Sequence, residues 1–219
     1  MRNVELYTYT PMGQAVLEAL RQVNETIVEN ITAAGPGQFK AYVFGGAALH
    51  LLTNVRGSAD IDVEVVASSR LDLSDIVVTY QDSDGQQLLL VIDTEFHTGI
   101  SGMLHDDYRE NAIPLEHNPD APLHTFVLSP LDLAVSKLDR LAANDQNDIE
   151  ALFKCGLFTV EELSDHALDA LEAAIGPQVR LKGNIDYMLQ KLRAIANESE
   201  EPSLSTSASH TSQRRPPDR

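Results

Sequence analysis

Residues 44–63 read Phe-Gly-Gly-Ala-Ala-Leu-His-Leu-Leu-Thr-Asn-Val-Arg-Gly-Ser-Ala-Asp-Ile-Asp-Val and place a glycine pair ahead of a pair of aspartates. A glycine pair between a strand and a helix lets a phosphate approach the backbone N–H groups at the helix N-terminus. Asp60 and Asp62, two positions apart on one strand, share a face of that strand and can hold a divalent cation. This order of features predicts a site for phosphoryl or nucleotidyl transfer.

The segments that lead into the glycine pair indicate a helix followed by a strand. A helix is predicted over residues 11–31, because apolar side chains recur there at near-helical spacing and Pro11 suits the first turn. These apolar residues are Val16, Leu20, Val23, Ile27 and Ile31. A short strand is predicted over residues 40–44, and an apolar helix follows the glycines through residues 48–52.

Beyond the glycines, the pattern changes to that of strands. Apolar and acidic residues alternate over 60–65, which predicts a half-buried strand with one carboxylate-lined face. Two further strands, over 76–80 and 88–96, flank an Asp84-Gly85 step that favours a hairpin turn. Residues 98–124 are expected to form a loop with a short helix near Asp106, and a last strand is expected over 125–128.

From Ser129 onward the pattern is helical. Ser129, Pro130 and Asp132 have the order of a cap, a first-turn proline and a first-turn acid, and further helices are predicted over 146–154, 160–175 and 179–196. The predicted fold class is α+β, with a small mixed sheet and flanking helices before a helical C-terminal part. The predicted boundaries are a core over 1–128, a helical subdomain over 129–196 and a disordered tail over 197–219.

Composition restricts the partners. The formal net charge of −17 over 219 residues disfavours a general nucleic-acid binder, although a nucleotide held through a metal ion remains compatible with it. No apolar run approaches the length of a membrane span, so no membrane partner is predicted. The single cysteine, Cys155, cannot form an intrachain disulfide; a core position for it and a cytoplasmic location are expected.

The stretch over 44–63 resembles the signature of the nucleotidyltransferase superfamily. That signature is a hydrophobic residue and Gly-Gly, a spacer, and then Asp-hydrophobic-Asp-hydrophobic, matched here by Gly45, Gly46, Asp60 and Asp62. Arg56 and Ser58 resemble the Arg-x-Ser-x-Asp version found in minimal nucleotidyltransferases, including abortive-infection toxins of toxin–antitoxin pairs. The resemblance implies binding of phosphates near Gly45, Gly46, Arg56 and Ser58, and of a metal by Asp60 and Asp62.

The resemblance also implies a third carboxylate on a neighbouring strand. Asp93 is the favoured candidate, as general base or shared metal ligand, because it is the first acid after an apolar run. Glu95 lies two residues further and faces the same way on a strand, so both remain open.

A second resemblance lies in Leu-Asp-Leu-Ala-Val-Ser-Lys-Leu-Asp-Arg-Leu at 131–141 and Asn-Asp-Gln-Asn-Asp-Ile-Glu-Ala-Leu at 144–152. These stretches look like the Lys-Leu-x-Arg and Asp-x-x-Asp-Ile/Leu region of the same toxin-like families. This second resemblance implies that Lys137 contacts the triphosphate, that Arg140 supports the triphosphate or binds a carboxylate, and that Asp145 or Asp148 lies near the site. Lysine suits a phosphate as a mobile point charge. The alternative is that Lys137 and Arg140 are exposed helix residues and that Asp145 and Asp148 start the next helix.

The resemblance as a whole implies a metal-dependent nucleotidyltransferase. Mg²⁺ or Mn²⁺ would be the cofactor, an NTP the substrate, and an RNA (tRNA) or protein hydroxyl the acceptor of the NMP; an antitoxin is an expected partner. Asp60, Asp62 and Asp93 would be both the catalytic residues and the metal ligands. Two alternatives remain: a non-catalytic nucleotide-binding module that retains the fold, and an interaction protein whose acidic surface binds a basic partner.

Overall fold

The computed structural model describes residues 4–67, 73, 76–93, 103–116, 118–174 and 178–200. These residues form an α+β fold in which six strands make one mixed sheet. The strands are β1 Phe39–Val43, β2 Asp60–Val66, β3 Val77–Gln81, β4 Gln87–Asp93, β5 Ile113–Pro114 and β6 Leu123–Val127. The helices are α1 Pro11–Asn30, α2 Gly45–Thr53, α3 Tyr108–Asn111, α4 Pro130–Leu138, α5 Ala143–Lys154, α6 Val160–Ala173 and α7 Gln178–Glu200.

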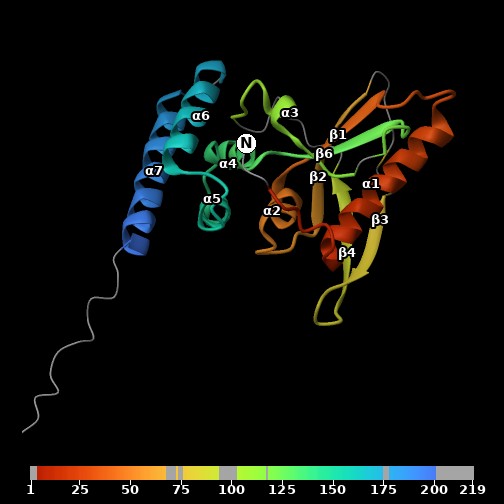
Figure 1. Cartoon of the computed structure of the whole chain (residues 1–219), viewed down its shortest axis with the longest axis horizontal. Coiled ribbons are helices and arrows are strands. Elements are labelled where there is room, and N and C mark those ends of the chain that lie inside the picture. The colour runs from red at the N-terminus through yellow and green to blue at the C-terminus, as the bar shows by residue number, and fades with distance from the viewer. Residues whose placement is uncertain are drawn as a thin grey trace, which may run out of the picture.

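The order of the strands in the sheet is β3-β4-β2-β1-β6-β5. β2 is antiparallel to β1 but parallel to β4, and β3 and β4 form the hairpin predicted around Asp84-Gly85. Along β2, Ile61 and Val63 are buried, whereas Asp60 and Asp62 retain access to solvent. The helices α1 and α2 pack against the sheet (Figure 1). Because side chains alternate between the faces of a strand, the buried Ile61 and Val63 lie on one face of the sheet and the acids of β2 lie on the other.

Helix caps explain where the helices begin. Thr10 caps α1 by accepting the Gly13 N–H at 3.0 Å, and Pro11 follows in the first turn. Ser129 caps α4 in the same way and is also followed by a proline. Both cap residues precede an apolar stripe that is buried in the core.

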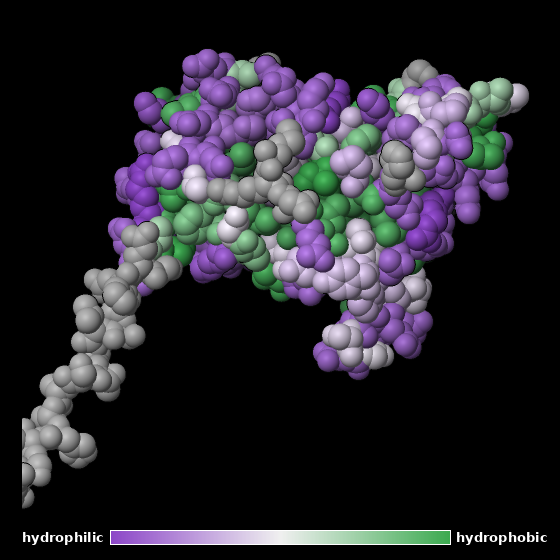
Figure 2. Space-filling model, viewed as in Figure 1, coloured by the Kyte–Doolittle hydropathy of each residue, from purple (hydrophilic) through white to green (hydrophobic). Residues whose placement is uncertain are grey.

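The helical part lies at one end of the molecule (Figure 1). α6 packs against α7 there, while α4 and α5 lie between this pair and α2. In Figure 2 the surface over α6 and α7 is largely hydrophilic, and apolar side chains gather toward the middle of the same face. Among the helices of the described residues, none combines the length and the apolar composition needed to cross a bilayer.

The structure confirms the predicted fold class and corrects several details. β5 was missed within the expected loop 98–124, because two residues carry no periodic signal. α5 begins at Ala143 rather than at residue 146. Cys155 is exposed rather than in the core, since it follows the last turn of α5. α7 extends to Glu200, four residues into the tail predicted over 197–219, and the rest of that tail lies outside the described residues. The division at residue 128 stays a prediction.

Candidate functional site

Three carboxylates meet on the open face of the sheet. Asp60 and Asp62 lie two positions apart on β2, and Asp62 pairs directly with Asp93 in the parallel β2–β4 register. Paired residues of neighbouring strands point to the same side of a sheet. Asp60 is exposed, whereas Asp62 and Asp93 are half-buried. The structure thus brings together the three acids predicted as a set; Glu95, the alternative to Asp93, lies outside the described residues.

The negative charges of these three aspartates repel one another. Burial, followed by the charges of Asp60 and Asp93, raises the pKa of Asp62 above its ordinary value. Lys137 and Arg140 oppose this shift in pKa but do not cancel it. A divalent cation would relieve the repulsion, and a donor set made of carboxylate oxygens alone suits Mg²⁺ or Mn²⁺.

Gly45 is required by the position of Asp62. Its φ of +60° lies in the left-handed region, and a Cβ at this residue would lie 1.7 Å from Asp62 Oδ2. The backbone of β1 and β2 is joined at the same point, because Phe44 N–H donates to the Asp62 carbonyl at 2.8 Å. The first residue of α2 and the central carboxylate are therefore in direct contact, and only glycine leaves room for it.

Gly46 faces the side chains that precede β2. A Cβ on Gly46 would lie 2.7 Å from Ser58 Oγ and 3.1 Å from Arg56 Nη1. Ser58 Oγ donates a hydrogen bond to Asp60 Oδ1 at 2.8 Å. The N-cap residue of α2 is Phe44, whose ring offers no acceptor to the first N–H groups of the helix. One site is thus bordered by the start of α2, by Arg56 and Ser58, and by the carboxylates.

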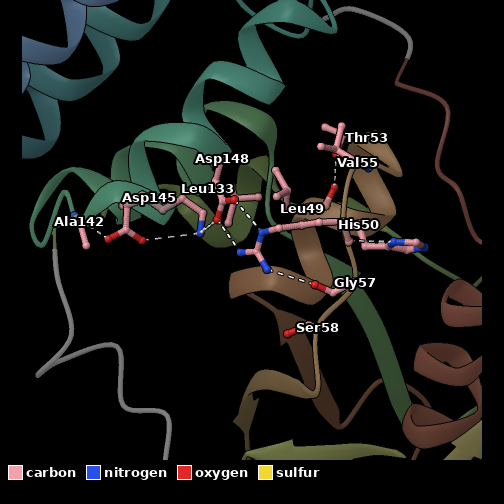
Figure 3. A network of polar contacts seen from close by, with 12 residues as sticks. Leu49, His50, Thr53, Val55, Gly57, Ser58, Leu133, Ala142, Asp145 and Asp148 are labelled. Atoms are coloured by element: carbon pink, nitrogen blue, oxygen red, sulfur yellow. Dashed lines mark hydrogen bonds and ion pairs between the residues drawn. The ribbon is translucent and has the colours of Figure 1, made fainter. Parts of the chain in front are cut away.

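Asp148 connects this place to the helical part (Figure 3, dashed lines around Asp148). Its carboxylate accepts two hydrogen bonds from Arg56, at 2.8 and 2.7 Å, and lies 2.7 Å from Lys137 Nζ. Burial alone would raise the pKa of Asp148, but the hydrogen bonds from Arg56 and Lys137 outweigh it and lower the pKa. Lys137 is itself buried, so its ammonium group is held by Asp148 rather than exposed on a helix surface.

Asp145 and Arg140 form a second pair beside the first. Arg140 donates to both oxygens of Asp145, at 2.7 and 2.8 Å, and Asp145 also accepts the Ala142 N–H at 3.0 Å. Asp145 therefore stabilises the start of α5, as its alternative interpretation predicted. Arg140 is exposed and binds a carboxylate, one of the two roles that the resemblance implied for it.

Sequence reasoning missed the partners of Glu64, the third acid on the open face of β2. Tyr108 donates its hydroxyl to Glu64 at 2.7 Å, and Arg109 Nη2 lies 2.6 Å from the same carboxylate. Arg109 therefore compensates the charge of Glu64, which distinguishes this acid from Asp62. The signal available was the alternation along residues 60–65; nothing local indicated that α3 would reach that strand.

Two comparisons with known proteins bear on the family of the chain. A search of curated proteins found no match to the chain. A family model described as a nucleotidyltransferase of unknown function (DUF6036) matches residues 18–192, which include every residue of the site described above. The chain therefore belongs to this nucleotidyltransferase family.

Proposed function

We propose that the protein transfers a nucleoside monophosphate from an NTP to a hydroxyl group of an RNA or protein acceptor. The observation that carries the proposal is the pairing of Asp62 with Asp93 across β2 and β4, beside Asp60 and against Gly45. A helix N-terminus borders the same carboxylates, as an NTP with bound metal requires.

Asp60, Asp62 and Asp93 would hold Mg²⁺ or Mn²⁺. The bound cation supplies neutralisation of phosphate charge. Because Gly45 and Gly46 have no side chains, phosphates would approach the first N–H groups of α2. Asp93, the half-buried acid on β4, serves as a metal ligand or accepts the proton of the attacking hydroxyl. A bond then forms from that oxygen to the α-phosphorus, the bond to the bridging oxygen breaks, and pyrophosphate leaves.

The roles of the basic residues follow from their contacts with Asp148. Arg56 is partly exposed and its Nη1 approaches Gly46, so its guanidinium supports the phosphates while Asp148 holds its other edge. Lys137 shares the Asp148 carboxylate with Arg56 and is buried against it, so it adds positive charge to the same site. From this position its ammonium group would contact a phosphate. Asp148 is thus a positioning residue for two cations.

Label transfer identifies the acceptor. The charge of −17 disfavours extended contact with an RNA backbone, so a short RNA end or a protein hydroxyl is the expected acceptor. Purified chain is incubated with each α-³²P-labelled NTP and Mg²⁺, with total RNA or with cell protein, and label transfer is measured. We expect transfer in one arm and its loss in Asp60→Ala and Asp62→Ala. Asp84→Ala, an exposed acid in the β3–β4 turn, is the matched control and should retain activity.

Failure has two recognisable forms. Absence of transfer, or equal transfer by both aspartate variants, contradicts the enzymatic proposal. If Mg²⁺ with NTP still raises the melting temperature without transfer, the chain is instead a non-catalytic nucleotide-binding module. A toxin role adds one requirement: expression in a bacterial host should arrest growth for the native chain and not for Asp62→Ala, and a neighbouring antitoxin should relieve the arrest.

A further inference from the structure

A second cluster of ligand-type side chains lies outside the site described above. It joins His105, in the segment before α3, to Asp132 on α4 and His166 on α6. One ligand atom from each residue lies within 4.8 Å of the other two. His105 and Asp106 are consecutive in a stretch expected to be a surface loop, but the fold turns His105 toward residues 27 and 61 positions away.

The three side chains are in direct contact. His166 Nε2 lies 2.7 Å from Asp132 Oδ1, and the rings of His105 and His166 stack with centroids 4.2 Å apart and planes 9° from parallel. Asp132 is completely buried, and its other oxygen accepts a hydrogen bond from Ser129. A buried carboxylate requires a compensating positive charge, which an imidazolium or a metal ion can provide.

An ion pair between Asp132 and His166 explains two of the three residues but not His105. The ring of His105, stacked on that of His166, brings a second imidazole to the same carboxylate. An imidazole nitrogen can give its lone pair to a metal ion. Two ring nitrogens beside one carboxylate oxygen form a donor set that first-row transition metals bind.

We propose that His105, Asp132 and His166 bind a divalent metal ion such as Zn²⁺. The nitrogen donors separate this site from the all-oxygen carboxylates of β2 and β4, which suit Mg²⁺. Ser129 is in place to orient Asp132, as residues around metal ligands do. His105 Nδ1 now accepts the exposed Asp107 N–H at 3.1 Å, and this one hydrogen bond is given up when the ring binds metal.

The surroundings leave room for a fourth ligand. A cavity of about 370 Å³ borders the cluster and is lined by both histidines, with Asp107 and Glu162 among its other walls. Three protein ligands and an open position are the arrangement of zinc sites that bind a water or a further molecule. A metal here would also tie the segment before α3 to both α4 and α6.

The cluster is independent of the proposed transferase site. It shares no residue with that site, and Asp132 precedes Lys137 by five positions on α4, about 140° around a helix and about 7.5 Å along it. Loss of one site should therefore leave the other intact.

The test measures Zn²⁺ binding to the full chain by isothermal titration calorimetry, with Mg²⁺ as the comparison cation and Co²⁺ as a spectroscopic probe. We expect one Zn²⁺ per chain, a rise in melting temperature with Zn²⁺ that requires His105 and His166 whereas the response to Mg²⁺ does not, and a ligand-field spectrum of nitrogen-coordinated Co²⁺. His105→Ala and His166→Ala should each weaken Zn²⁺ binding by roughly tenfold or more. Asp106→Asn, the exposed neighbour of His105, and Asp62→Asn should bind as the native chain does.

Several results would overturn the proposal. These are the absence of stoichiometric binding, binding that survives both histidine substitutions, and binding that Asp62→Asn removes while His105→Ala does not. The chain has five other histidines, so the variants identify which of them bind. The Co²⁺ spectrum needs no variant, which keeps the test decisive even where a substitution prevents folding, and circular dichroism confirms that each variant folds.

Discussion

At Gly45 an alanine methyl group would occupy the place of the Asp62 carboxylate, 1.7 Å from Oδ2. Gly45→Ala should therefore displace Asp62, and should lower the free energy of unfolding by about 2 kcal/mol through the left-handed backbone and the clash. We also expect the rise in melting temperature produced by Mg²⁺ and NTP to disappear. Thermal unfolding with and without ligand measures both effects.

The matched control for Gly45 is Gly85 in the β3–β4 turn. Its φ of +80° imposes a similar backbone strain, but a Cβ there meets nothing within 4 Å. Gly85→Ala should lose stability while keeping its response to Mg²⁺ and NTP. If both variants keep that response, the contact between Gly45 and Asp62 is not part of a nucleotide site.

The negative charge of Asp62 destabilises the folded chain. Its pKa is raised by burial and by Asp60 and Asp93, so between the ordinary value of 3.8 and the raised value the folded chain binds more protons than the unfolded chain. Stability therefore falls as the pH rises through this window, and the full penalty is present above it. Asp62→Asn should raise the free energy of unfolding at pH 7 by about 1 kcal/mol.

The pH and metal dependence make this prediction specific to Asp62. The advantage of Asp62→Asn should shrink as the pH is lowered toward 3.8, where the native carboxyl is protonated as well. Saturating Mg²⁺ should reverse the order, since a cation bound to the proposed site would stabilise the native chain by mass action. Denaturant unfolding across pH measures the difference; an asparagine variant that is less stable than the native chain at neutral pH contradicts the argument.

At the scale of elements, Asp148 fastens α5 to α4 and to the segment before β2. Asp148 and Lys137 are both buried, and removing one partner of a buried pair leaves an uncompensated charge. Asp148→Ala should therefore lower the free energy of unfolding by about 3 kcal/mol. Glu150→Ala on the same helix breaks pairs with two more exposed lysines and should cost less than about 1 kcal/mol. Equal losses in urea unfolding would show that the Asp148 pair is not special.

Local pattern was enough to predict the elements that carry the site. The alternation over 60–65 predicted β2, and the Asp84-Gly85 step predicted the hairpin that ends in Asp93. The resemblance implied only that a third carboxylate, Asp93 by preference, would lie on a neighbouring strand. Its direct pairing with Asp62 was not predicted, because a parallel pairing depends on a crossover that no local signal specifies.

Local sequence patterns did not predict which distant segments contact one another. Arg56 and Asp148 are 92 residues apart, and His166 reaches Asp132 over 34. Periodicity indicates which face of a helix is apolar, but not which polar residue of another helix will meet it. Lys137 shows the difference: its position on α4 was predicted, but its burial against Asp148 depends on how α5 packs.

At the scale of the whole molecule, we expect the parts on either side of the predicted boundary at residue 128 to unfold together. α4 and α5 contact α2 on one side and α7 on the other, and Leu128 N–H donates to the carbonyl of Val43 in β1. Apolar residues of the sheet and of α4 to α7 belong to one continuous core. Because neither part can expose its share of this core without disrupting the other, we expect a single cooperative unfolding transition.

The distribution of tyrosines allows this prediction to be measured on the native chain. The sequence has six tyrosines and no tryptophan, and Tyr187 is the one tyrosine beyond residue 128. Tyrosine fluorescence therefore reports mainly on the sheet part, whereas far-ultraviolet circular dichroism at helical wavelengths includes α4 to α7. Coincident melting curves, with equal calorimetric and van't Hoff enthalpies, are expected. If helical signal persists after the tyrosine transition is complete, the C-terminal helices are a separate folding unit, and the helical part could then move over the nucleotide without loss of the sheet.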